Sequence, residues 1–181
     1  MGFQQSIRFI EKNAFETAEK IKNKDYTKYD AKDVQGYKYN NDSLIFESVK
    51  YADMSAVGTG MLPKMKFMRK VSEDKISIFH NYQVPPPVGE VSNLREIYIE
   101  NQTPDLVYRI GSDGKLKLVN SLNVEKELSS CPVVVTKYKN NEYKAVGTEE
   151  SQSNANKFLN KAIFRDAVRL MVIADYNQQC Q

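Results

Sequence analysis

The sequence predicts one α+β domain over residues 1–181, with a helix at each end and an antiparallel β-sheet between them. Apolar residues recur at steps of three and four in residues 3–23 and again in residues 154–176, which is typical of amphipathic helices. In residues 43–147 they recur with a period of two, which is typical of strands. Short turns join consecutive strands, so we expect antiparallel pairing into about six to eight strands. The sheet is either open or strongly curved, with the C-terminal helix packed on it.

The N-terminal helix is predicted over residues 3–23 from a stripe of apolar side chains, which comprises Phe3, Ile7, Ile10, Ala14, Ala18 and Ile21. Such a stripe has to be buried, either on the sheet or against a partner. Residues 24–42 follow and are polar, with several Tyr and Lys residues. We expect a surface connection there, with a short strand at Tyr37–Tyr39.

Most strands are predicted from alternating segments that are bounded by turn-forming residues. One strand begins after Ser43, and the next two form a hairpin about residues 72–75. The clearest hairpin surrounds residues 111–114, because Gly114 can supply the positive φ that a tight turn needs. Further strands are expected at residues 94–100, 131–138 and 143–146.

The composition argues against several kinds of site. The formal net charge is +3, from 26 basic and 23 acidic residues, which is a small bias for a dedicated nucleic-acid binder. No apolar run is long enough for a transmembrane helix, and the residues after Met1 do not resemble a signal peptide. His80 is the only histidine, which excludes a multi-histidine metal site within one chain. We therefore predict no catalytic, cofactor-binding or metal-binding residues.

Cys131 and Cys180 are the only cysteines and are candidates for a disulfide. Cys131 precedes a predicted strand and Cys180 follows the C-terminal helix, so a bond would pin that helix to the sheet. For a loop of this length, the lost chain entropy of the unfolded state corresponds to about 4 kcal/mol of stabilisation. Two free thiols are the alternative. A disulfide implies an oxidising compartment, so we expect a periplasmic or secreted protein, with the cytoplasm as the alternative.

Two groups of residues are candidates for contacts with a partner. The first is basic and interleaves with apolar residues on one predicted strand: Lys64, Lys66, Arg69 and Lys70. Such a strand either follows an anionic surface, such as nucleic acid or lipid head groups, or simply exposes a solvated face. The second group is aromatic and lies mostly in the polar segment after the first helix: Tyr26, Tyr29, Tyr37 and Tyr39. Tyrosines are common in protein interfaces, but they also occur in plain loops.

Three functions are compatible with these residues. With no recognisable catalytic set, we favour a non-enzymatic binding or interaction protein that is exported and acts through the sheet face or the Tyr-rich segment. Its partner would be a protein or a small apolar ligand, and we do not expect nucleic acid. The first alternative is a small enzyme with a carboxylate or Tyr pocket under the C-terminal helix. The second is an anionic-surface or nucleic-acid binder through Lys64–Lys70. Candidate carboxylates for acid–base chemistry, whose spacing singles out no pair, are Glu47, Asp53, Glu96 and Glu100.

Overall fold

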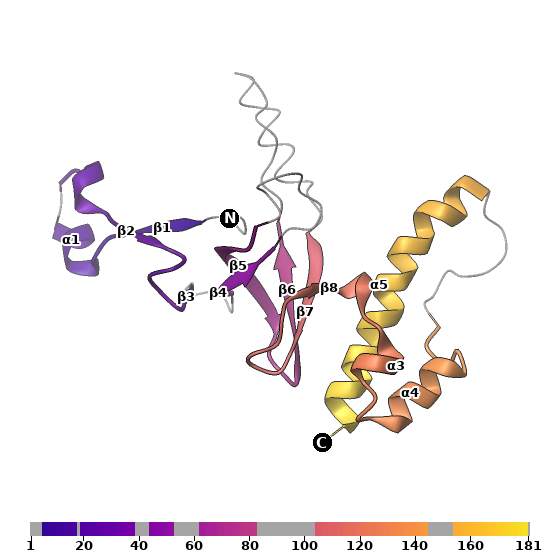
Figure 1. The fold of residues 1–181 in the computed structure, drawn as a ribbon. Helices are drawn as coiled ribbons and strands as arrows, with labels where there is room; N and C mark the ends of the chain where they lie inside the picture. Colours follow the sequence, from indigo (N-terminus) through magenta and orange to yellow (C-terminus); the bar gives the residue numbers. More distant parts are fainter. Residues whose placement is uncertain are drawn as a thin grey trace. The chain divides into compact units, whose positions relative to one another are not determined.

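The computed structural model of the protein describes residues 5–17, 19–38, 44–52, 62–82, 104–144 and 154–180, with the side chains of the last helix from Asp166 onward. Its strands form a two-stranded ribbon and a six-stranded antiparallel sheet with the order β3-β4-β5-β6-β7-β8 (Figure 1). Together with the helices, this sheet confirms the predicted α+β class. None of the helices in the described ranges has an apolar stretch that could cross a membrane.

The chain forms two compact units. The first unit comprises Met1–Val71 and His80–Asp105, and the second comprises Ser72–Phe79 and Leu106–Gln181. The prediction of one domain over residues 1–181 stays a prediction. The first elements in chain order are β1 (Ser6–Phe9), α1 (Lys12–Thr17), η1 (Asn23–Asp25), β2 (Thr27–Asp30), β3 (Gly36–Lys38), β4 (Ile45–Tyr51) and β5 (Lys64–Ser72). They are followed by β6 (Ile76–Asn81), β7 (Asp105–Ile110), β8 (Lys117–Leu118), η3 (Val119–Ser121), α3 (Val124–Glu127), α4 (Pro132–Lys139) and α5 (Asn154–Gln179).

The N-terminal helix is much shorter than the predicted range of residues 3–23. Helix α1 is confined to Lys12–Thr17, and residues 6–9 form strand β1 instead. Strand β1 pairs antiparallel with β2, with Ile7 opposite Tyr29. Ile7 also packs against the buried cluster of the first unit. Strand pairing and burial of Ile7 thus outweigh the helical spacing of the sequence, because tertiary contacts override local propensity.

The buried cluster of the first unit is small and aromatic. It consists of Ala31, Phe46 and Phe67, with Ile7, Val34, Tyr37 and Leu44 packed against it. Tyr37 of β3 stacks on Phe46 of β4 with 4.7 Å between ring centroids, and it meets Phe67 in a T-shaped arrangement at 5.0 Å. Aromatic pairs of this kind contribute about 0.5–1.5 kcal/mol beyond the burial of their area. The predicted short strand is confirmed over Gly36–Lys38, and it holds Tyr37 in the core.

The second unit contains the larger core. Its buried residues come from strands and helices: Ile76, Tyr108, Val119, Leu122, Val124, Leu128, Cys131, Val134, Val172, Ile173 and Cys180. The C-terminal part of α5, yellow in Figure 1, packs on this core. The side-chain amide of Asn177 bonds both the N–H and the C=O of Ile76 in β6, each at 2.9 Å. The C-terminal helix therefore packs on the sheet, as predicted, and it extends slightly beyond the predicted end at residue 176.

The prediction of a strand over residues 131–138 is wrong, because Pro132–Lys139 form helix α4. Proline suits the first turn of a helix, where its missing N–H is not needed and its fixed φ is already helical. Val134 is fully buried whereas Val133 is 54% exposed, so α4 buries one side only. Among the described residues, the β-rich middle of the chain therefore ends at Leu118 and not at residue 147. The strand predicted at 94–100 lies outside the described residues.

The hairpin about residues 111–114 is confirmed, but its glycines act differently from the prediction. Strands β7 and β8 pair antiparallel on either side of the turn. Gly111, and not Gly114, has the positive φ, at 67°. A Cβ atom on Gly114 would lie 2.1 Å from the carbonyl oxygen of Ile110. Gly114 is therefore required for the close approach of two backbone segments.

Candidate functional site

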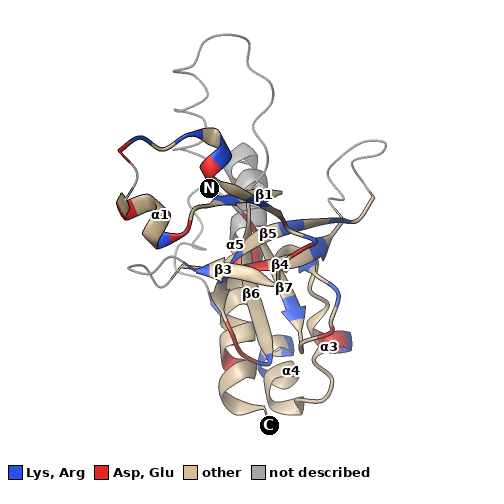
Figure 2. Cartoon of the chain, turned by 90° about the vertical axis from the view of Figure 1, so that its left-hand side faces the viewer, with Lys and Arg blue, Asp and Glu red and all other residues tan. Residues whose placement is uncertain are grey.

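The basic group predicted on β5 is divided between the two faces of the strand. Residues directly opposite each other on antiparallel strands share a face. The three lysines of the group share the face of Val49, whereas Arg69 lies opposite Phe46 on the other face. The four basic residues, whose positions on the β5 ribbon are blue in Figure 2, therefore do not share one face of the strand.

Two of the three lysines are engaged within the first unit. Lys70 forms an ion pair with Glu47 at 2.7 Å, and only 11% and 22% of the two side chains are exposed. Lys66 donates a hydrogen bond to Oδ1 of Asn81, whose side chain is fully buried. A partly buried ammonium group with such a partner is poorly placed to bind phosphate. Lys64 is the exposed lysine of the group.

The predicted tyrosine group is also divided. Tyr37 packs in the aromatic cluster of the first unit, Tyr26 is half-buried, and Tyr39 lies outside the described residues. Tyr29 of β2 is 36% exposed, and its ring lies 6.5 Å from that of Phe9 in a T-shaped arrangement. Of the described tyrosines in this group, Tyr29 is the one whose side chain is exposed at the surface.

Two further aromatic side chains, which the sequence analysis missed, are exposed on β1 and α1. We call β1, α1, η1 and β2 the N-terminal ribbon. Phe9 of β1 is 51% exposed and Phe15 of α1 is 57% exposed. None of the residues of α1 is buried. Neither phenylalanine falls on the apolar stripe of the predicted helix over residues 3–23, and this misfit was the signal that could have identified them.

Cys131 and Cys180 form a disulfide in the second unit, with 5.7 Å between their Cα atoms. Both residues are nearly inaccessible, with 5% and 7% of their surface exposed. Cys131 directly precedes α4 and Cys180 directly follows α5, so the bond joins the start of α4 to the end of α5. It therefore links two helices and not a helix to a strand, and neither sulfur is available as a thiolate nucleophile.

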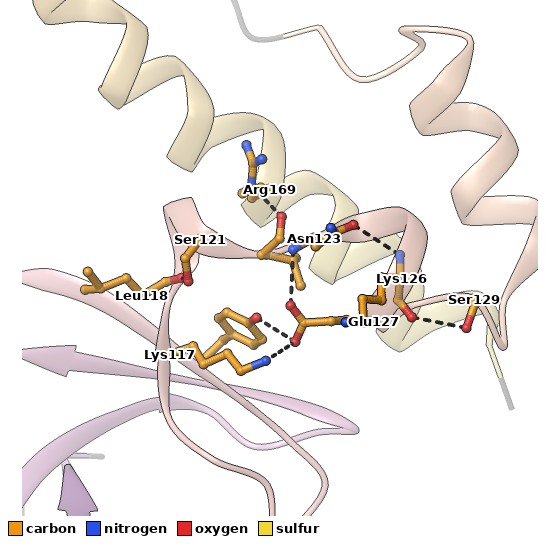
Figure 3. A network of polar contacts seen from close by, with 10 residues as sticks. Lys117, Leu118, Ser121, Asn123, Lys126, Glu127, Ser129 and Arg169 are labelled. Atoms are coloured by element: carbon orange, nitrogen blue, oxygen red, sulfur yellow. Dashed lines mark hydrogen bonds and ion pairs between the residues drawn. The ribbon is translucent and has the colours of Figure 1, made fainter. Parts of the chain in front are cut away.

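Glu127 of α3 lies at the centre of a polar network in the second unit (Figure 3). Its Oε2 accepts hydrogen bonds from the Tyr108 hydroxyl at 2.9 Å and from Nζ of Lys117 at 2.6 Å. Its Oε1 accepts from the backbone N–H of Asn123 at 3.2 Å. Asn123 in turn caps the start of α3 by accepting from the N–H of Lys126. One carboxylate thus ties β7 and β8 to the first turn of α3.

The surroundings of Glu127 fix its protonation state. Partial burial alone would raise the pKa of Glu127, but the bonds from Lys117, from the N–H of Asn123 and from Tyr108 together lower it. Burial and the bond to Glu127 raise the pKa of Tyr108. Glu127 is therefore ionised and Tyr108 protonated near pH 7. Neither group titrates near neutral pH, as an efficient general acid or base would.

Asp175 of α5 has similar surroundings. Its Oδ2 accepts from the Tyr143 hydroxyl at 2.5 Å and from Nζ of Lys137 at 2.9 Å. The bond from Tyr143 lowers the pKa of Asp175, partial burial opposes this change, and Lys137 lowers the pKa further. Burial and then the contact with Asp175 raise the pKa of Tyr143. This second Tyr–carboxylate–Lys set fastens α5 to α4 and to the residues that follow α4.

Of the other residues considered for acid–base chemistry, the structure describes Glu47 and His80. Glu47 is held in its ion pair, and the remaining carboxylates lie outside the described residues: Asp53, Glu96 and Glu100. His80 is half-buried on β6, where burial and then the charge of Arg69 lower its pKa. In the described part of the chain, Nδ1 of His80 has no hydrogen-bond partner.

Comparisons of the chain with protein-family models, with curated proteins and with solved structures find no match. The function is therefore inferred from the side chains themselves. The two features that stand out are the exposed aromatic side chains of the N-terminal ribbon and the internally paired carboxylates of the second unit.

Glu127→Gln is expected to lower the free energy of unfolding at pH 7 by about 1–3 kcal/mol, because Tyr108 and Lys117 lose a charged acceptor. A carboxyl whose pKa is lowered by folding stabilises the fold above its unfolded pKa, and this contribution is lost as the pH falls through the folded pKa. Below the ordinary glutamate value of 4.5, acid should therefore destabilise the variant less steeply than the wild type. Urea unfolding at a series of pH values measures both effects.

Glu125→Gln is the matched control for this prediction. Glu125 is on the same helix and pairs with Lys139 at 3.3 Å, but both side chains are more than half exposed. Its substitution should change the free energy of unfolding by less than about 0.5 kcal/mol. Equal losses from the two substitutions would contradict the role assigned to Glu127.

Proposed function

We propose that this protein is a non-enzymatic interaction protein that docks onto a protein partner through the N-terminal ribbon. The observation that carries the proposal is the exposure of Phe9, Phe15 and Tyr29 on elements that bury little of their own surface. A two-stranded ribbon is only marginally stable by itself, and a helix as short as α1 is unstable alone in water. Exposed aromatic side chains on such a segment are typical of residues that become buried in an interface.

A protein accounts for this surface better than a small apolar ligand. Small ligands bind in concave sites that enclose most of their surface. Phe9 and Tyr29 instead lie on a ribbon whose opposite face is also exposed, at Arg8 and Lys28. Aromatic residues and arginine are enriched in protein–protein interfaces, so the composition of the ribbon fits a protein surface.

The alternative functions have less support. The basic residues of β5 occupy two faces, and Lys66 and Lys70 already have partners, which argues against binding to nucleic acid or anionic lipid through this strand. An enzyme pocket near α5 would need a carboxyl with a raised pKa or a free base. Glu127 and Asp175 instead have lowered pKa values and lysine partners.

We further propose that the protein acts in an oxidising compartment, in the periplasm or outside the cell. The support is the bond between Cys131 and Cys180, because structural disulfides persist in oxidising environments and are rare in the cytoplasm. Cys131 precedes the start of α4 and Cys180 follows the end of α5, so the bond stabilises the unit that carries the larger core.

The combined substitutions Phe9→Ser, Phe15→Ser and Tyr29→Ser are expected to abolish capture of the partner. Each aromatic residue that anchors an interface contributes about 2 kcal/mol or more, so the loss of three exceeds a hundredfold in affinity. Immobilised wild-type and variant proteins are incubated with extract and secreted fractions of the source cells, and retained proteins are identified by mass spectrometry. Far-UV circular dichroism and melting temperature confirm that the variant is folded.

Val133→Ser is the control for this capture experiment. It removes an apolar side chain with a similar exposure, 54%, from α4 of the second unit. The control should retain the same proteins as the wild type. If the aromatic variant also retains them at wild-type levels, the N-terminal ribbon is not the docking element.

Thiol titration tests the proposed compartment. Protein from the source cells, denatured without reductant, should show no reactive thiol, and both Cys131 and Cys180 should react after reduction. Replacing both cysteines by Ala should lower the free energy of unfolding by about 2–4 kcal/mol, because the unfolded chain regains conformational freedom. Two reactive thiols in the non-reduced material would contradict export.

A further inference from the structure

One edge of the N-terminal ribbon has backbone groups that pair with no other described strand. Strand β1 pairs with β2 in a sheet of two strands. The N–H of Ala31 donates to the C=O of Gln5 at 2.9 Å, and bonded and non-bonded pairs alternate from there along the ribbon. The N–H and C=O groups of Ser6 and Arg8 therefore point away from β2. Within the part of the chain that the structure describes, these groups form no backbone hydrogen bond.

The open edge of β1 is also basic. Arg8 is exposed, and its guanidinium lies 3.4 Å from the first residue of η1, which is flanked by Lys22 and Lys24. These three side chains form no ion pair with any described residue. At the other edge of the ribbon, Lys28 pairs with Asp30 at 3.0 Å. Arg8 thus brings to β1 a positive charge that forms an ion pair with no described residue, whereas the charge of Lys28 on β2 is compensated.

The two faces of the ribbon differ in chemistry. Ile7 and Phe9 share one face with Tyr29, whereas Ser6 and Arg8 lie on the other face. Successive side chains of a strand point to opposite faces. In a strand that pairs with the edge of β1, every second side chain therefore lies beside apolar and aromatic groups. The side chains between them lie beside positive charge.

We propose that β1 accepts an extended segment of the partner in which acidic residues alternate with apolar ones. Backbone hydrogen bonds to Ser6 and Arg8 hold the added strand. The alternation of acidic and apolar side chains determines which segment of the partner binds. A second copy of β1 is disfavoured, because edge-to-edge pairing brings two Arg8 side chains together, and like charges on paired strands destabilise. The inference rests on the proposed function, since it specifies the partner of the same ribbon.

Binding of two synthetic peptides to the full chain tests this inference. The probes are acetyl-(Glu-Val)4-amide and acetyl-(Lys-Val)4-amide, each labelled for fluorescence anisotropy. The wild type should bind the glutamate peptide at least about tenfold more tightly than the lysine peptide, because opposite charges pair across the strands. Arg8→Glu should reverse the preference. Lys38→Glu, which makes the same change of charge on β3, should leave the preference unchanged.

Ser6→Pro tests the mode of binding separately from the charge. Proline at this position removes an outward-facing N–H and blocks the edge, but it removes no hydrogen bond between β1 and β2. It should weaken binding of the glutamate peptide at least about tenfold, because the added strand loses main-chain bonds. Circular dichroism and Phe9–Tyr29 contacts in nuclear magnetic resonance spectra confirm that the ribbon is intact.

Each outcome of these titrations decides one point. Equal binding of the two peptides, or an unchanged preference in Arg8→Glu, overturns the inference that the partner's segment is acidic. Unchanged binding by Ser6→Pro, with an intact ribbon, overturns strand addition. If the wild type binds neither peptide while the aromatic variant still loses its captured partner, this inference is wrong and the proposed function stands. If the aromatic variant keeps that partner, the proposed function itself fails.

Discussion

The low burial of the N-terminal ribbon is the constraint on which the functional account depends. Ordering the backbone of one residue costs about 1–2 kcal/mol, and burying a large apolar side chain contributes about 1.5–3 kcal/mol. Ile7 is half-buried and makes only part of such a contribution by packing on the aromatic cluster of the first unit, and α1 buries no residue. Contact of Phe9, Phe15 and Tyr29 with another protein would supply the missing burial. In the proposed function, the same exposed side chains that leave the ribbon weakly held are the ones that contact the partner.

The second unit has the opposite character. Its core encloses residues from β6 to α5, and the disulfide closes it between the ends of α4 and α5. Its partly buried carboxylates each receive a lysine and a tyrosine, so their charges are satisfied within the protein. A buried polar network destabilises the fold when some of its groups have no hydrogen-bond partner, and it makes the structure rigid when all of them do. We infer that Glu127 and Asp175 stabilise this unit.

The sequence predicted the parts of the fold that depend on local periodicity. The long apolar stripe of α5 and the turns around residues 72–75 and 111–114 were sufficient to place these elements. The predictions failed where partners distant in sequence decide the conformation. Residues 6–9 became a strand because β2 offers backbone partners and the aromatic cluster accepts Ile7. The valines of α4 have high strand propensity, but Pro132 and the one-sided burial of Val134 favour a helix.

The candidate site was predictable only in part for the same reason. The tyrosine group includes one residue of the proposed docking element, but its members separate into the core residue Tyr37 and the exposed residue Tyr29, because β3 and β2 pair with different strands. The basic group on β5 is divided between two faces, and Lys70 is paired with Glu47 across the sheet, which no local pattern reveals. Phe9 became visible as an exposed residue only when β1 was known to be a strand of the ribbon.

Hydrogen exchange at single backbone amides of the free, full-length chain tests the central claim most directly. If the edge of β1 is open, the amides of Ile7 and Phe9, which face β2, exchange more slowly than those of Ser6 and Arg8, which face outward. Equal protection at all four positions would contradict the account, because the edge would then already be covered within the chain and could not receive a partner.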